Sequence, residues 1–230
     1  TIVVPIYGPE KTMPTLHGFA FSNYYNIVKH ALLHKGVAFE EHKVYTDEES
    51  LKSFSPVGKV PALTTDDGVN LSESTVLIDY LEDAYPEVPL YPAGASDRAR
   101  VRQMVKTTEL YIELPARRMI AFVFGGGDAP AELKDEVRTV LERGVNGINA
   151  LASFNPYMAG AELTAADIYL RYALLIPKMI GPAQLDWDIC ASINGYADWD
   201  ALMAGSEVSK KVDADAEANT PEFMARMVGG

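Results

Sequence analysis

Strand-like segments occur only in the first part of this chain, and helical patterns take over after them. Residues 16–21 and 37–44 have the apolar or loosely alternating character of short strands, and two short apolar runs flank Asp67-Gly68, a strong hairpin signal. Apolar residues at helical spacing follow the first strand from Ser22 and return at 77–84. The predicted order is β-α-β-(α)-β-β-α and then helices alone. This order indicates a small α/β domain followed by an all-helical one.

A segment rich in proline and glycine, residues 85–97, separates the two parts. The helices predicted beyond it are 97–123 with a bend at Pro115, one that opens at Asp128 or Pro130, one that begins at Thr164 and stops before Pro177, one near 196–203, and one after Pro221. We therefore expect an N-terminal extension at 1–15, an α/β domain at 16–90, a linker at 91–96 and an all-helical domain at 97–230.

The composition is that of an ordinary globular protein with an acidic charge balance. Of the 230 residues, 48% are hydrophobic and 23% charged, and the net charge is −12 at neutral pH. This balance argues against binding to nucleic acid or to anionic membranes, because both need clustered Lys and Arg. The sequence has no run of the ~18 apolar residues that a membrane span needs. Its first residues lack the basic and apolar regions of a signal peptide.

The cysteine and histidine content limits redox and metal chemistry. Cys190 is the single cysteine, so the chain cannot form an intramolecular disulfide, a multi-cysteine metal cluster or a C-x-x-C redox pair. The four histidines have no recognised metal spacing; His30 and His34 are four apart on a predicted helix but lack an acidic third ligand nearby. We expect no metal and a protein of the reducing cytoplasm.

The string SPVGKVPAL, residues 55–63, places Pro61 inside what otherwise looks like a short buried strand. Proline has no N–H to give to a sheet, so it is confined to strand edges, first positions or bulges. One interpretation is a trans proline that begins an edge strand. The other is a cis peptide that leaves the backbone of Val60 free to pair with an extended ligand. The residues alone leave both open.

Four strings of the chain carry a resemblance to a known family. They are FSNYYNIVKHALLHKG from residue 21, FSPVGKVPAL from residue 54, LSESTVLIDYLEDAYP from residue 71 and LTAADIYL from residue 163. In this order and spacing the chain resembles the glutathione S-transferases over residues 16 to about 205. The resemblance implies a thioredoxin-like N-terminal domain followed by an all-helical C-terminal domain, and it is closest to the cytosolic, bacterial-type members with a serine active site.

The resemblance also implies a set of glutathione-binding residues. Val60, before a cis Pro61, would pair with the cysteinyl backbone of glutathione as an added strand does. Glu73 and Ser74 begin the next predicted helix, whose free N–H groups and partial positive charge suit the γ-glutamyl carboxylate. Ser72 or Ser74 is also a candidate for a plain N-cap, and the two roles are compatible. Lys59 would reach the glycyl carboxylate, although a loop lysine is often only solvated.

Ser22 is the predicted catalytic residue. The thiol of glutathione has an unperturbed pKa near ~8.5, so little of it is thiolate at neutral pH. A hydroxyl that donates a hydrogen bond to the sulfur, with a helix N-terminus behind it, stabilises the thiolate by roughly 1.5–3 kcal/mol. Ser22 also reads as a plain helix N-cap, and Asn23, Tyr24 and Tyr25 are neighbours that could take its place.

Two further sets of residues are distinguished by their pattern. Tyr111, Arg118 and Phe122 lie where the family binds the hydrophobic substrate, although aromatic residues at helical spacing are also typical of a core. Thr164 and Asp167 form a T-x-x-D capping box, which is a folding device without chemistry.

The predicted function is a glutathione transferase that activates the glutathione thiol and conjugates it to a small hydrophobic electrophile. The resemblance implies a cytoplasmic homodimer with a role in detoxification and glutathione as co-substrate, without nucleic-acid or membrane partners. Alternatives are a glutathione-dependent peroxidase or isomerase at the same site, or a non-catalytic glutathione- or ligand-binding protein of the same fold. The sequence does not identify the electrophile.

Overall fold

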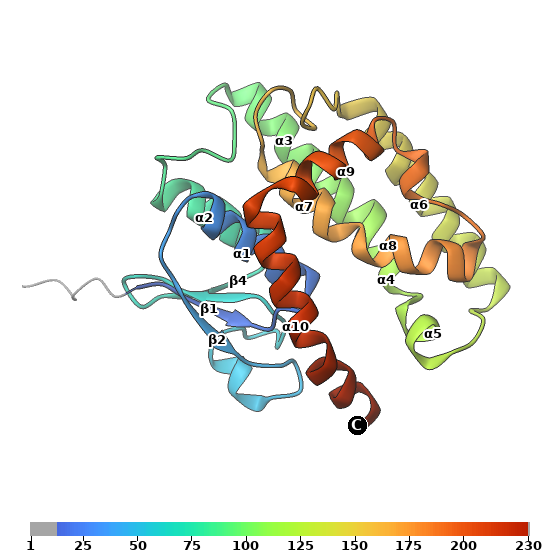
Figure 1. Ribbon diagram of the computed structural model, residues 1–230, viewed down its shortest axis with the longest axis horizontal. Coiled ribbons are helices and arrows are strands. Elements are labelled where there is room, and N and C mark those ends of the chain that lie inside the picture. The colour runs from blue at the N-terminus through green and yellow to red at the C-terminus, as the bar shows by residue number, and fades with distance from the viewer. Residues whose placement is uncertain (1–12, 230) are drawn as a thin grey trace, which may run out of the picture. The chain divides into compact units, whose positions relative to one another are not determined.

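The computed structural model describes residues 13–229, and the chain divides into two compact units (Figure 1). Unit 1 contains the described residues up to Pro86 together with those from Val212 onward, and unit 2 is Glu87–Lys211. The last helix, α10 (Glu207–Gly229), therefore packs largely with unit 1, whereas the sequence assigned it to the helical domain 97–230. The predicted extension at 1–15 lies mostly outside the described residues.

Unit 1 is built on a four-stranded mixed sheet of order β2-β1-β3-β4. The strands are β1 (Thr15–Gly18), β2 (Glu40–Lys43), β3 (Ala62–Thr64) and β4 (Asn70–Ser72). β1 pairs with β2 in parallel and with β3 antiparallel, and β3 pairs with β4 antiparallel. The predicted hairpin at Asp67-Gly68 is confirmed, and Gly68 has the positive φ of 84° that such a turn requires. β1 is shorter than predicted because the chain turns after Gly18.

Helices α1 (Asn23–His34) and α2 (Ser74–Ala84) bury the apolar faces that the sequence pattern predicted. Leu16, Ile27, Leu63 and Leu77 are fully buried and contribute to the core of the unit. Gly36 follows the end of α1 with φ 67°, which is the left-handed conformation that stops a helix. Residues 49–53 form a short 3₁₀ helix, η1 (Glu49–Ser53), where the sequence showed only a weak helical stripe.

A buried histidine lies on β1, next to another histidine on β2. The Nδ1 atoms of His17 and His42 are 2.9 Å apart, and His17 Nε2 is 2.7 Å from Thr64 Oγ1. The ring of His17 also stacks on Phe54 at 3.8 Å between centroids. Burial, and then the charge of His42, lower the pKa of His17 to about 4. His17 is therefore neutral in the folded protein at physiological pH.

Acidification is expected to destabilise the protein through His17. The folded-state pKa of about 4 lies below the ordinary value of 6.5, so the stabilisation is fully present above pH ~6.5 and is lost as the pH falls toward ~4. The whole shift corresponds to about 3 kcal/mol. Urea unfolding across this range measures the loss, and His17→Gln, which cannot titrate, is expected to flatten the curve. A wild-type free energy of unfolding that stays constant between these limits would contradict the prediction.

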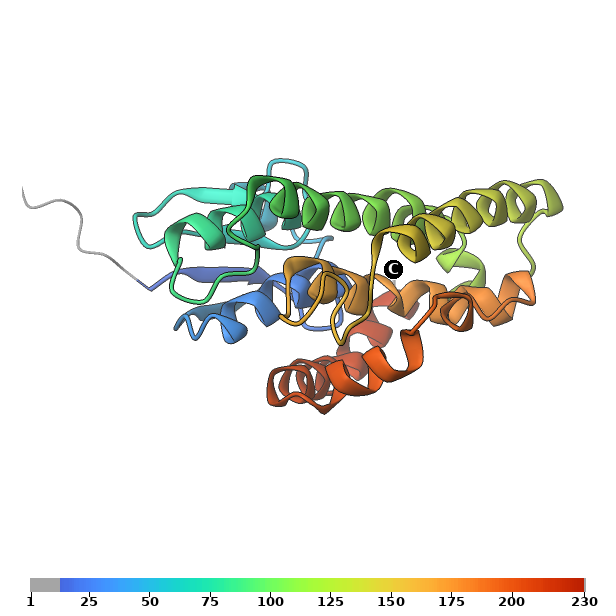
Figure 2. The same cartoon turned by 90° about the horizontal axis from the view of Figure 1, so that it is seen from above.

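Unit 2 is helical throughout the described part. Its elements are α3 (Ala95–Thr108), the π-helix η2 (Glu109–Glu113), α4 (Leu114–Arg117), α5 (Ile120–Gly125), α6 (Ala131–Leu151), α7 (Ala165–Ala173), α8 (Leu175–Ile180), the π-helix η3 (Gly181–Leu185), the 3₁₀ helix η4 (Cys190–Ser192) and α9 (Tyr196–Gly205). The long helices α3 and α6 run side by side (Figure 2). The structure contains no helix within residues 13–229 that is long and apolar enough to cross a membrane.

The predicted irregularity at Pro115 takes the form of the π-helix just before it. Proline has no N–H to donate to the carbonyl of Tyr111, and the N–H of Leu114 instead donates to Glu109, five residues back. Gly144 of α6 packs closely against this segment, because a Cβ there would lie 2.5 Å from the carbonyl oxygen of Tyr111. The π-helix and the close helix contact therefore occur in the same segment.

The prolines later in the chain have different effects from each other. The helix that begins after Thr164 ends at Ala173, before Pro177 as predicted, and Pro177 lies in the first turn of α8, where its missing N–H has no intrahelical partner to lose. The prediction that a helix begins after Pro221 is wrong, because α10 continues through it. Contacts of α10 on both sides of Pro221 hold the helix together.

Candidate active site

Ser22 caps the N-terminus of α1, as predicted. Its backbone is extended, its N–H donates to the carbonyl of Phe19 at 3.0 Å, and its Oγ accepts from the N–H of Tyr25 at 3.4 Å. A serine hydroxyl has one donor and two acceptor positions. Within the described part of the chain the Ser22 hydroxyl donates to no other group, so its proton remains available to an incoming anion.

Tyr25 is engaged elsewhere and cannot replace Ser22. Its ring is buried, and its hydroxyl donates to Glu41 Oε2 at 2.6 Å. Burial raises the pKa of Tyr25, and the hydrogen bond to Glu41 raises it further. Lys29 Nζ approaches the same carboxylate oxygen at 2.7 Å. Tyr25 is therefore packed in unit 1 and protonated, with its hydroxyl committed to Glu41.

Gly18, at the end of β1, lies close to both Tyr25 of α1 and Val60. A Cβ on Gly18 would lie 2.5 Å from Cδ2 of Tyr25 and 3.2 Å from Cβ of Val60. The φ of Gly18 is +148°, a conformation that favours glycine. A side chain at this position would therefore meet both the start of α1 and the segment before β3.

Gly18→Ala is expected to destabilise the protein by about 2–4 kcal/mol, because overpacking and an unfavourable φ add together. The ring of Tyr25 is buried and tied to Glu41, so it cannot swing aside. Gly36→Ala is the matched control, since it also has positive φ (+67°) but meets no atom within 4 Å. Chemical denaturation measures both variants. Equal losses of unfolding free energy in the two variants would show that the contact of the added Cβ with Tyr25 and Val60 does not destabilise the protein.

Val60 and Glu73 lie at the same end of the sheet as the Ser22 turn. In the register His17 pairs with Ala62, and Ala62 pairs with Ser72, so the residues just beyond each strand end emerge together. The Val60–Pro61 peptide bond is cis, which decides between the two interpretations of this string. Among residues 13–229, the backbone N–H and C=O of Val60 make no hydrogen bond. They are available to an extended ligand.

Glu73 and Ser74 form the entry into α2. Glu73, not a serine, occupies the N-cap position; it is exposed, makes no side-chain capping bond and has φ 72°. A non-glycine residue held in this region costs on the order of 1–3 kcal/mol and is typical of functional sites. Ser74 is the first residue of the helix and is buried. It lies at the positive end of the α2 dipole, where a helix start favours an anion.

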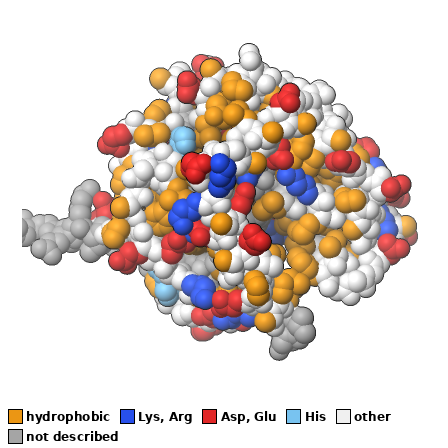
Figure 3. All heavy atoms as spheres, in the orientation of Figure 1, with side chains coloured by type: hydrophobic (Ala, Val, Ile, Leu, Met, Phe, Trp, Pro, Cys, Tyr) orange, Lys and Arg blue, Asp and Glu red, His pale blue; other side chains and the backbone are white. Residues whose placement is uncertain are grey.

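The helices of this acidic chain differ in the charge of their first turns. Figure 3 shows acidic side chains spread over the viewed face, often beside basic ones. The first turns of α3, α6, α7, α9 and α10 each carry an Asp or Glu, whereas those of α1 and α2 carry none. The first turns of α4, α5 and α8 lack a carboxylate as well, and Glu73 places one at the N-cap of α2. The start of α1 has an acidic residue neither in its first turn nor at its N-cap, Ser22, so its partial positive charge favours an anionic ligand.

Lys59 precedes Val60 in the same loop. Its backbone N–H donates to Ser55 Oγ at 3.3 Å, and its side chain is exposed. No carboxylate among the described residues pairs with its ammonium group. This leaves the lysine able to meet a ligand carboxylate at this end of the sheet.

The predicted hydrophobic-substrate residues all lie in unit 2. Tyr111 is 45% exposed on the π-helix η2, which an aromatic residue of a core would not be. Arg118 follows α4 and forms a bidentate ion pair with Glu136, at 2.7 and 3.1 Å. Phe122 lies half-buried on α5. Their role in binding a substrate stays a prediction.

Sequence reasoning missed the contribution of α10 to this site. Asn219 accepts a hydrogen bond at 3.0 Å from the backbone N–H of Phe21, the residue just before Ser22. The two residues are 198 positions apart, so no local spacing could indicate the contact. The only nearby signal was Pro221, and it led to the wrong helix start.

The residues that the structure describes contain no group of three or more His, Cys, Asp or Glu side chains that could hold a metal ion. Cys190 is buried, which raises its pKa to about 11.

The comparison with known proteins agrees with this architecture. The family model for the N-terminal domain of glutathione S-transferase matches residues 16–89. A glutathione S-transferase of Pseudomonas putida F1 is 38% identical, over 95% of this chain and 99% of its own length. A maleylpyruvate isomerase of a Ralstonia species is 31% identical, over 67% of this chain and 78% of its own. Among solved structures, a maleylpyruvate isomerase described as a zeta-class bacterial glutathione S-transferase matches with TM-score 0.68 and 26% identity, over 86% of this chain and 95% of that one. The chain belongs to the glutathione S-transferase family.

Proposed function

We propose that this protein is a glutathione transferase in which Ser22 activates the thiol of glutathione. The observation that carries the proposal is the gathering of three features at one end of the sheet: the donor proton of Ser22, the open backbone of Val60 and the positive end of the α2 dipole. Each suits a different part of one tripeptide. Ser22 suits the thiol, the backbone of Val60 suits the peptide backbone, and the start of α2 suits a terminal carboxylate.

In the proposed mechanism, glutathione binds in an extended conformation. Val60 pairs with the cysteinyl backbone beside Pro61, and the N–H and hydroxyl of Ser74 hold the γ-glutamyl carboxylate. Glu73 accepts from the ligand ammonium, and Lys59 pairs with the glycyl carboxylate. These contacts place the sulfur at the start of α1, where the Ser22 hydroxyl donates to it.

The chemistry then follows from the thiolate. The thiol proton leaves to solvent, and the sulfur attacks an electrophilic carbon of the second substrate, forming a C–S bond. In a substitution the leaving group departs with the electron pair; in an addition the adjacent carbon is protonated. Tyr111, Arg118 and Phe122 remain the proposed residues for the hydrophobic electrophile. The family resemblance carries the further proposals of a cytoplasmic homodimer with a role in detoxification.

Isomerisation is the second candidate, favoured by relatives that are named maleylpyruvate isomerase. A thiolate that adds to a carbon–carbon double bond leaves a single bond about which the product can rotate. Elimination of the same thiolate then restores the double bond in the other geometry, and glutathione is regenerated. Ser22 would have the same role in this reaction, so the site residues do not separate the two candidates.

Calorimetric titration with glutathione, followed by product assays, tests the proposal. We expect saturable binding that weakens when the start of α2 loses the Ser74 hydroxyl, as in Ser74→Ala. Consumption of glutathione with an aryl halide supports conjugation. Conversion of a cis-unsaturated dicarboxylic acid without consumption of glutathione supports isomerisation. Faster turnover of an organic hydroperoxide would favour a peroxidase. Binding without any turnover would favour a carrier, and no heat at millimolar glutathione would overturn the proposal.

A further inference from the structure

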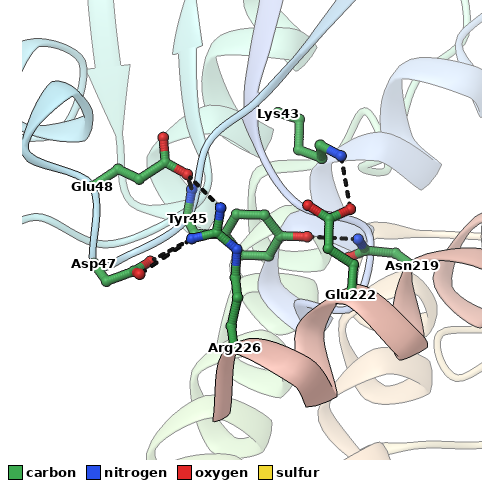
Figure 4. Close-up of polar contacts among 7 residues, drawn as sticks. All are labelled: Lys43, Tyr45, Asp47, Glu48, Asn219, Glu222 and Arg226. Atoms are coloured by element: carbon green, nitrogen blue, oxygen red, sulfur yellow. Dashed lines mark hydrogen bonds and ion pairs between the residues drawn. The ribbon is translucent and has the colours of Figure 1, made fainter. Parts of the chain in front are cut away.

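Helix α10 holds the loop that leads into Ser22. Figure 4 shows side chains of α10 meeting β2 and the loop that follows it, although the two segments are far apart in sequence. Asn219 is the central residue of this contact: its Oδ1 accepts from the N–H of Phe21 at 3.0 Å, and its Nδ2 donates to the hydroxyl of Tyr45 at 2.7 Å. Tyr45 is almost fully buried, so it gives the amide a fixed partner.

Aromatic and ionic contacts hold α10 against the same region. Phe223 stacks on Phe21 at 4.2 Å and on Phe19 at 5.6 Å between ring centroids. Arg226 lies 4.0 Å from the ring centre of Tyr45 and pairs with Asp47 and Glu48 (Figure 4). At the other end, Asp215 pairs at 2.7 Å with the buried ammonium of Lys29 on α1. Asn219 is thus set in place by contacts on both sides.

The loop 19–22 depends on three hydrogen bonds for its shape. The carbonyl of Phe19 accepts from the N–H of Ser22, and the carbonyl of Ala20 accepts from Asn26 Nδ2 at 2.9 Å. Both of these donors belong to the loop itself or to α1. The third bond, from Phe21 N–H to Asn219, is the one supplied from outside. The peptide unit between Ala20 and Phe21 is thus held on both sides, its carbonyl by Asn26 of α1 and its N–H by Asn219 of α10. Loss of the Asn219 bond removes one of these two restraints directly before Ser22.

We infer that Asn219 is a positioning residue for the thiol-activating serine, and that α10 fixes the direction in which the Ser22 hydroxyl points. The inference rests on the proposed function of Ser22. Asn219 touches neither the reacting sulfur nor any ligand group; it acts through the Phe21 peptide. Catalytic geometry is sensitive to displacements of this kind. Misplacing a catalytic group by about 1 Å can lower the reaction rate far more than it lowers the affinity for the substrate.

A double-mutant cycle between Ser22→Ala and Asn219→Ala tests the inference. In the wild-type background, Asn219→Ala is expected to raise the pKa of bound glutathione by about half a unit to one unit and to lower kcat about 3- to 10-fold, with the KM for glutathione within about two-fold. In the Ser22→Ala background it is expected to change neither pKa nor kcat further. Thiolate absorbance against pH and steady-state kinetics give these values.

Two further variants keep the test decisive. Tyr45→Phe removes the hydroxyl that orients the Asn219 amide but keeps the ring under Arg226, and a smaller change of the same sign is expected. It also serves if Asn219→Ala fails to fold. Lys43→Ala is the matched control, because it breaks an exposed ion pair to Glu222 on the same helix at 2.8 Å without touching Asn219. It is expected to leave pKa and kcat unchanged.

Each other outcome overturns the inference in a distinguishable way. Equal effects of Asn219→Ala in both backgrounds would mean that Asn219 acts independently of Ser22. No effect of Asn219→Ala or Tyr45→Phe, while Ser22→Ala still raises the thiol pKa, would leave the proposed function standing and remove the positioning role. An unchanged thiol pKa in Ser22→Ala would remove the catalytic assignment itself. A loss in Lys43→Ala as large as that in Asn219→Ala would indicate that only the docking of α10 matters.

Discussion

Replacing Ser22 with alanine is expected to raise the pKa of bound glutathione by about one to two units and to lower kcat/KM at neutral pH by about 10- to 100-fold. Ser22 caps α1 with an acceptor lone pair, so its proton can be donated to sulfur at the same time. A hydrogen bond to an anion contributes roughly 1.5–3 kcal/mol, which sets the size of both effects. Thiolate absorbance of the complex against pH measures the first, and conjugation kinetics measure the second.

The matched control is Ser22→Thr, which keeps both the cap and the hydroxyl proton and is expected to retain most of the pKa shift. Losing the cap in the alanine variant also costs about 1 kcal/mol of stability, so the free energy of unfolding must be measured for both variants. If Ser22→Ala binds glutathione with the wild-type thiol pKa, another group or the α1 N-terminus activates the thiol.

Asp167→Ala is expected to lower the free energy of unfolding by about 4 kcal/mol or more. The capping box with Thr164 is confirmed, and the structure adds two partners that the motif does not predict. Asp167 accepts from the N–H of Met158 at 2.7 Å, from the N–H and the hydroxyl of Thr164 at 2.9 Å each, and from Trp199 Nε1 at 2.9 Å. Asp167 and Trp199 are almost fully buried, so alanine would leave these donors unpaired away from water.

Asp167→Asn is the informative comparison, because it keeps one acceptor oxygen and the volume of the side chain; an intermediate loss is expected. Asp128→Ala removes an exposed carboxylate that pairs with Lys134, and its effect should stay within about 0.5 kcal/mol. Urea denaturation at constant pH measures all three variants. A loss below about 1 kcal/mol for Asp167→Ala would mean that water reaches the donors, contrary to the burial seen here.

Local patterns in the sequence predicted much of the fold and of the candidate site. The helical stripe from Ile27 to Leu32 gave α1, Asp67-Gly68 gave the β3–β4 hairpin, and T-x-x-D gave the start of α7. These features depend on periodicity, turn chemistry and capping, which act over a few residues. The strings around Ser22, Val60 and Glu73 could be picked out from the resemblance for the same reason.

The tertiary structure decided how these strings combine. Whether the peptide bond before Pro61 is cis depends on its surroundings in the sheet. The positive φ of 72° at Glu73, a non-glycine residue, is likewise stabilised by the surrounding structure. The π-helix before Pro115 packs closely against Gly144 of another helix, a contact that no local pattern indicates.

The sequence by itself determined the order of the elements and identified the residues proposed for the site, because both depend on local spacing. Only the tertiary structure placed α10 on the loop before Ser22, across 198 positions of sequence. The physical reason is that an amide oxygen, a phenylalanine ring and an arginine on a polar helix have no periodic signal of their own. Their partners at Phe21, Tyr45 and Asp47 become neighbours only when the chain has folded.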